Sequence, residues 1–166
     1  SDLFENDVDV VVAEGKPDEV ILQAAREKAA DLIVTGVAGN DPIAQSLFGS
    51  ATSTLIRKGG LPVLVVKKRG TEPYHRVVVA SDLSEASAAA LKLAAHLFDP
   101  SMITLFHVFD TPFAPFVQDR ELYEQKLKSG VLDDARKFAE AHLGSDVAGL
   151  AIEVASGDPS VLIADY

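Results

Sequence analysis

The chain has 166 residues, 48% of them apolar, and a formal net charge of −10 at pH 7. This length suits one domain with a real core, while the negative charge argues against nucleic acid or an anionic membrane surface as a partner. No apolar run approaches the roughly 20 residues of a membrane span and no signal peptide is apparent. The chain has no cysteine, which excludes disulfides and fits a reducing cytoplasm.

The first part of the chain alternates predicted strands with predicted helices. β-branched or apolar runs predict strands over 8–13, 32–35 and 63–66. Apolar residues at helical spacing predict helices over 17–29, opened by a proline, and over 51–60.

The alternation starts again after a polar linker over 68–74. Strands are predicted over 76–81, 103–108 and 151–155, and a long amphipathic helix over 118–142. A helix after the turn at 82–85 is expected to pack through one face, which consists of Ala86, Ala89, Ala90, Leu93, Ala94 and Leu97. A last helix opens at Pro159.

Glycines cluster between the second predicted strand and the helix that follows it. Gly36 and Gly39 follow Thr35, and Gly49 with Ser50 opens the helix. Glycine lets the backbone approach an anion, and the free N–H groups of a helix start point at it. A Ser hydroxyl adds a donor, so the stretch is typical of a phosphate-binding loop. The alternative is that the glycines only end a strand and shape a turn.

The pattern Gly36-x-x-Gly39, nine residues, Gly49-Ser50, followed by the apolar run 61–66, resembles the ATP-binding signature of the universal stress protein family. The resemblance implies that Thr35, Gly36 and Gly39 lie along the ribose and phosphates of ATP. It also implies that Gly49, Ser50 and Ala51 hold the phosphates. Asp41 departs from the family pattern, since it brings a negative charge near the phosphates and favours a less charged nucleotide.

A second candidate group follows the predicted strands of the other half. Asp82 comes at the carboxyl end of the strand 76–81, where open parallel sheets bind ligands. The resemblance gives Asp82 the place of the acid that approaches the nucleotide, sets Ala80 against the adenine, and makes the backbone of Val108 read the adenine edge. The alternatives are structural: Asp82 lies near a helix N-cap, for which Ser84 competes, and Val108 belongs to the core.

The two ends of the chain resemble each other at a constant spacing of 142 residues, which aligns 10–17 with 152–159. This similarity suggests an internal repeat. The family resemblance then implies that 1–67 corresponds to the C-terminal half of one copy and 75–166 to the N-terminal part of the next. The fold class expected is α/β: one Rossmann-like open parallel sheet of five strands, supplied in permuted order, with helices on both faces.

Taken together, the resemblance implies an ATP-binding universal stress protein with a regulatory role in the stress response and Mg²⁺ as a companion of the nucleotide. A homodimer is expected, with exchanged halves as one arrangement. No protein metal site is predicted, and no lysine of a G-x-x-x-x-G-K-[ST] loop or G-x-S-x-G elbow is present, so at most slow ATP hydrolysis is expected. The alternative is an interaction module of the same fold that binds no nucleotide and dimerises through the strand 62–66.

Overall fold

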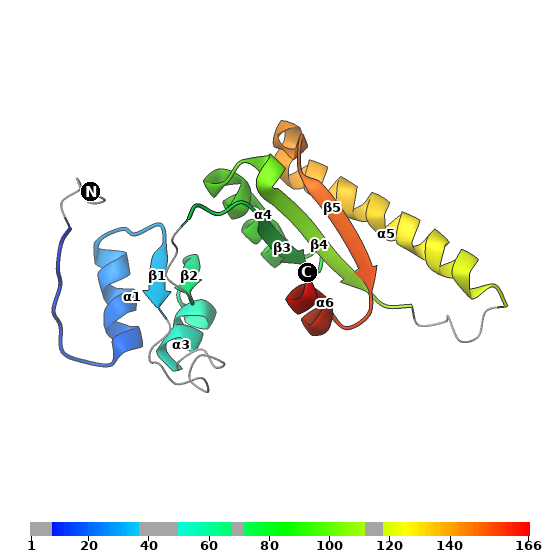
Figure 1. Ribbon diagram of the computed structural model, residues 1–166. Helices are drawn as coiled ribbons and strands as arrows, with labels where there is room; N and C mark the ends of the chain where they lie inside the picture. The colour runs from blue at the N-terminus through cyan, green and yellow to red at the C-terminus, as the bar shows by residue number, and fades with distance from the viewer. Residues whose placement is uncertain (1–7, 37–49, 68–71, 112–117) are drawn as a thin grey trace. The chain divides into compact units, whose positions relative to one another are not determined.

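The computed structural model describes residues 8–36, 50–67, 72–111 and 118–166. The chain divides into two compact units, Ser1–Thr71 and Glu72–Tyr166. Figure 1 labels the helices and strands of each unit. No helix among the described residues is long and apolar enough to cross a membrane.

The described part of the first unit is a two-stranded parallel sheet with two helices. Its elements are α1 (Pro17–Glu27), β1 (Ile33–Gly36), α3 (Ser50–Lys58) and β2 (Val63–Val66). β1 pairs with β2 from Ile33↔Val63 to Gly36↔Val66. A small buried cluster joins the helices to the sheet; it consists of Leu22, Ala25, Ile33 and Leu55.

The predicted strand over 8–13 is wrong in this structure, because the segment lies in none of the described sheets. Its valines are exposed, Val12 by 94% of its surface. β-branched residues favour an extended backbone, but a strand forms only where a neighbour completes its hydrogen-bond ladder. β1 pairs with β2, and among the described residues no strand pairs with this segment.

The second unit is a three-stranded parallel sheet of order β3-β4-β5. The strands are β3 (Val77–Ser81), β4 (Ile103–Phe109) and β5 (Ala151–Ser156); the helices are α4 (Glu85–Leu97), α5 (Arg120–Leu143) and α6 (Pro159–Asp165). Two short 3₁₀ turns, Pro100–Met102 and Gly144–Val147, precede β4 and β5. The register places Ser81 beside His107, and Val108 beside Ala155.

The core of this unit lies on one face of the sheet, under α4 and α5. Its buried members are Val79, Leu91, Ala94, Ile103, Leu105 and Ala139. Successive side chains of a strand point to opposite faces, so Phe106 lies on the other face. There the centroid of its ring lies 4.8 Å from that of the Tyr166 ring. The helices α4, α5 and α6 therefore cover both faces of the small sheet, and α6 crosses near the carboxyl end of β4 (Figure 1).

The fold class is α/β with parallel strands, as predicted, but the expected single five-stranded sheet in permuted order is wrong. The structure has two separate parallel sheets, of two and three strands. Apolar runs predict that strands are buried and parallel. They do not say which edges share hydrogen bonds, because that depends on the register and position of whole elements.

The predicted packed face of α4 is wrong, because the buried stripe is shifted along the helix by about one residue. The buried positions are Ser87, Ala88, Leu91 and Ala94, and of the predicted face only Ala94 is buried and Leu93 half-buried. An alanine-rich helix offers several apolar stripes of similar hydrophobicity. The N-cap at Ser84 sets where α4 begins, and contact with β3 and α5 then selects the stripe that is buried.

Candidate functional site

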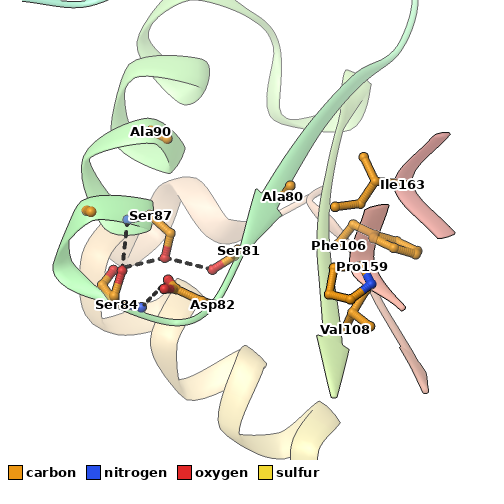
Figure 2. A pocket seen from close by; sticks show the side chains of 11 residues that line it. Ala80, Ser81, Asp82, Ser84, Ser87, Ala90, Phe106, Val108, Pro159 and Ile163 are labelled. Carbon is orange, nitrogen blue, oxygen red and sulfur yellow. Dashed lines mark hydrogen bonds between the residues drawn. The ribbon is translucent and has the colours of Figure 1, made fainter. Parts of the chain in front are cut away.

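A cleft of about 480 Å³ opens at the carboxyl ends of β3 and β4 in the second unit (Figure 2). Its size lies within the range of small-molecule sites, roughly 300–1,000 Å³. The turn from β3 into α4 supplies a polar side, and β4 with α6 supplies an apolar side. Open parallel sheets bind ligands at this end of their strands.

Asp82 lies in the turn between β3 and α4, with its carboxylate at the polar side of the cleft. The backbone N–H of Ser84 donates to Asp82 Oδ1 at 3.0 Å. The hydroxyl and the backbone N–H of Ser84 hold the pKa of the Asp82 carboxyl below its usual value, since these donors favour the charged form. Asp82 is exposed, so its carboxylate is available to accept hydrogen bonds from a ligand.

Ser84, and not Asp82, is the N-cap of α4, since the Ser84 side chain accepts from the backbone N–H of Ser87 at 3.4 Å. Asp82 instead forms an Asx turn, in which its own carboxylate accepts an N–H two residues on. Asp82 therefore lies near the N-cap, as the structural alternative expected, but Ser84 is the capping residue. The turn leaves the carboxylate beside the cleft (Figure 2).

Serine hydroxyl groups stabilise the same turn through further hydrogen bonds. Ser81 Oγ accepts the backbone N–H of Leu83 at 2.9 Å and donates to Ser87 Oγ at 2.9 Å. Ser87 Oγ in turn donates to the backbone carbonyl of Ser84 at 2.9 Å. Leu83 has φ +61°, a left-handed conformation that residues other than glycine seldom adopt.

His107 ties β4 to the end of β3. Its Nδ1 lies 2.7 Å from the backbone oxygen of Ser81, and because a carbonyl can only accept, Nδ1 is the donor. The sequence prediction assigned no role to His107. The strand register could have indicated this contact, because Ser81 and His107 form the last residue pair between β3 and β4.

The apolar side of the cleft suits a flat ring. Ala80 and Val108 line it from the strands, and Pro159 and Ile163 line it from α6. Phe106 forms its floor and is supported from the side by Tyr166, whose hydroxyl donates to Glu153 Oε1 at 2.9 Å. The sequence prediction missed Phe106, Pro159 and Ile163, because the packing of α6 on β4 brings them to the cleft.

The predicted site residues fall into two groups. Ala80, Asp82 and Val108 come together around the cleft of the second unit. Thr35 and Gly36 end β1, with the Thr35 hydroxyl donating to the carbonyl of Gly36 at 3.3 Å.

The rest of the predicted phosphate loop lies at or before the start of α3. Ser50 and Ala51 are the first two residues of that helix. Gly39 and Gly49 lie outside the described residues. Their phosphate-binding role stays a prediction.

The cleft of the second unit offers no side-chain cation. None of the described residues that line it is Lys or Arg. Phosphate groups next to Asp82 would be repelled rather than bound. The accepting carboxylate of Asp82 and the apolar walls instead fit the neutral part of a ligand, such as a base and its sugar hydroxyls.

Comparison with known proteins gives a family match over nearly the whole chain. The sequence model described as "Universal stress protein family" matches residues 2–67 and 73–166. The stress response protein NhaX of Bacillus subtilis is 39% identical over 61 residues, which cover 37% of each chain. The universal stress protein MJ0577 of Methanocaldococcus jannaschii is 36% identical over 63 residues, which cover 38% of each chain. The chain thus matches less than half the length of these curated relatives.

Proposed function

The chain belongs to the universal stress protein family, and we propose that it binds an adenine nucleotide, with ATP as the first candidate, and serves a regulatory role in the stress response with little or no catalysis. The single observation that carries the proposal is the cleft of the second unit, where an exposed carboxylate faces an apolar wall at the carboxyl ends of parallel strands. This combination fits a flat base attached to hydrogen-bond donors.

Each wall of the cleft has a part in the proposed binding. The adenine lies against Ala80, with the backbone of Val108 reading its edge, and Phe106 provides an aromatic floor. Asp82 accepts hydrogen bonds from hydroxyl or amino groups of the nucleoside. These contacts are uncharged on the ligand side, so a nucleoside keeps them when its phosphates are removed.

The phosphates need donors that the cleft lacks. For the first unit by itself we propose, as the family resemblance implies, a phosphate-binding role for the backbone around Thr35, Gly36, Gly39 and Gly49 and for Ser50 and Ala51 at the start of α3. Backbone N–H groups at the start of a helix bind anions without a basic side chain, and Ser50 and Ala51 are the first residues of α3. Mg²⁺ would accompany the phosphates.

The chain is further proposed to derive from two tandem copies, the first providing residues 1–67 and the second 75–166. Two glycines 142 residues apart support this, since Gly15 has φ +146° and Gly157 has φ +144°. A Cβ on Gly15 would contact the side chain of Val20, and a Cβ on Gly157 would contact that of Leu162. Each of these side chains lies the same number of residues after its glycine. Both turns lead into a helix with proline at its first turn.

A second candidate function is an interaction module that binds no nucleotide. The observation that favours it is the exposed apolar side of β2, at the edge of the two-stranded sheet, where Leu64 is exposed. An open edge of this kind pairs readily with another chain. A homodimer is part of both proposals, and only the nucleotide separates them.

The test is to denature the purified protein, identify released nucleotides by mass spectrometry, and titrate the stripped protein with ATP and Mg²⁺ by calorimetry. Asp82→Asn is expected to weaken ATP binding about tenfold or more, since it loses a charged acceptor. Gly39→Val is expected to abolish it. Asp99→Asn is the matched control, because Asp99 forms the same Asp–Ser turn with Ser101 outside the cleft.

The outcomes separate the two functions. Loss of affinity in the first two variants and not in the control supports nucleotide binding. If the stripped wild type takes up no nucleotide at millimolar ATP but forms a dimer by light scattering, the interaction module replaces it.

A further inference from the structure

Leu83 is held in a conformation that its own side chain disfavours. Its φ of +61° lies in the left-handed region, where a side chain other than glycine is strained. Its backbone N–H donates to Ser81 Oγ at 2.9 Å, so this hydrogen bond joins the two residues that flank Asp82 in the chain. The direction of the Asp82 carboxylate therefore depends on the Ser81 hydroxyl.

The Ser81 hydroxyl is itself oriented by Ser87. Ser81 gives its only hydroxyl proton to Ser87 Oγ, and Ser87 gives its own to the carbonyl of Ser84. With both protons committed, Ser81 Oγ presents its lone pairs to the N–H of Leu83. Ser87 is 9% exposed, so this chain of hydroxyl groups is largely shielded from water, where hydrogen bonds strengthen one another.

α4 does not need the hydroxyl of Ser87 to form. The carbonyl of Ser84 already accepts the backbone N–H of Ala88 at 2.9 Å. The cap at Ser84 uses the backbone N–H of Ser87, which any residue would supply. The contacts that need the Ser87 side chain are its donation to the carbonyl of Ser84 and its acceptance from Ser81.

We propose that Ser87 and Ser81 are positioning residues for the ligand-binding carboxylate of Asp82, acting through the left-handed turn at Leu83. The proposal rests on the function proposed above for the cleft. His107 completes the support, because it holds the carbonyl of Ser81 while Ser87 holds the side chain. The cleft thus binds its ligand with a carboxylate aimed in advance, which reduces the ordering cost of binding.

The test compares Ser87→Ala with Ser101→Ala in the full chain. Ser101 is the matched control, since its hydroxyl donates to Asp99 at 2.6 Å, away from the cleft. The readouts are the pKa of each aspartate by carboxyl-carbon NMR, the affinity for ATP by calorimetry, and thermal unfolding.

Ser87→Ala is expected to raise the pKa of Asp82, since the loosened turn no longer holds the Ser84 donors, the largest cause of the lowered pKa, against the carboxylate. It is also expected to weaken ATP binding about tenfold, the worth of roughly one hydrogen bond to a charged group. Ser101→Ala is expected to raise the pKa of Asp99 only. Ser87→Thr, which keeps the hydroxyl, is expected to restore the Asp82 pKa and the ATP affinity.

An unchanged Asp82 pKa in folded Ser87→Ala overturns the proposal, as does a shift that Ser101→Ala reproduces. If Ser87→Ala does not fold, Ser81→Ala is read by the same two measurements. If the wild type binds no ATP, the proposed function fails by itself. The Asp82 pKa still decides whether Ser87 positions the carboxylate.

Discussion

At the scale of single residues, carboxylates in this protein are set by local turns. Asp82, Asp99 and Asp158 each accept the backbone N–H of a serine two residues on. Their pKa values are all lowered, and in each case the serine hydroxyl is the largest cause. The same device serves one aspartate at the cleft and two that only begin helical turns, so the turn alone does not mark a site.

The pH dependence of stability follows from these turns. The folded pKa of Asp158 lies below its unfolded value because Ser160 and Val161 donate to the carboxylate. Its contribution is present above the unfolded pKa, near 3.9, and is lost as the pH falls through the folded pKa. Urea unfolding at steps from pH 6 to pH 2 is expected to show a smaller decrease in stability for Asp158→Asn than for the wild type. Parallel curves for the two proteins would contradict this.

Two glycines test the backbone at the residue scale. Gly157 has φ +144°, and a Cβ there would approach Leu162 Cδ1 to 3.2 Å. Gly157→Ala is therefore expected to destabilise the protein by about 1–3 kcal/mol. Gly130 lies within α5 with open space at its Cβ position, so Gly130→Ala is expected to stabilise by about 0.5–1 kcal/mol. Denaturant unfolding of both variants measures the difference, and equal effects would refute the assigned strain.

At the scale of elements, capping and contact decide which face of a helix is buried. In α4 the cap at Ser84 and the contacts with β3 and α5 bury Leu91 fully and leave Leu97 half exposed. α5 shows the same rule in a longer helix, where the buried residues are two alanines, Ala135 and Ala139. Small residues allow α5 to approach its neighbours closely.

Two leucines of α4 distinguish the observed face from the predicted one. Leu91→Ala is expected to cost about 2–5 kcal/mol of unfolding free energy, since Leu91 is fully buried in the core. Leu97→Ala is expected to change stability by no more than about 0.5 kcal/mol, because Leu97 is 51% exposed. The check is equilibrium unfolding in urea. A larger loss for Leu97→Ala would show that the predicted face is the buried one.

At the scale of the whole molecule, each unit has its own buried cluster and its own sheet. A sheet of two strands is marginal by itself, and three strands with a packed face are a common minimum for independent stability. The segment 8–13 adds exposed valines to the smaller unit. Exposed β-branched runs of this kind favour association with a further strand.

Hydrogen exchange tests how this segment behaves. The backbone amides of Val10–Val12 are expected to exchange quickly, because the segment has no strand partner among the described residues, whereas those of Leu105 and Phe106 in β4 exchange slowest. The measurement is amide exchange by NMR at low and high protein concentration. Slow exchange at both concentrations would contradict the unpaired segment, and protection only at high concentration would identify a second copy as its partner.

The sequence by itself determined the α/β class, the positions of most strands and helices, and the family, because periodicity and glycine spacing are local properties of the chain. It also placed Ala80, Asp82 and Val108 at strand ends, and the structure brings these residues to one cleft. Only the tertiary structure determined that segment 8–13 lies outside the described sheets, that the strands form two sheets, and which face of α4 is buried. It also brought Phe106, Pro159 and Ile163 to the cleft. The physical reason is that strand partners and burial depend on contacts between residues far apart in the chain, which local propensity does not encode.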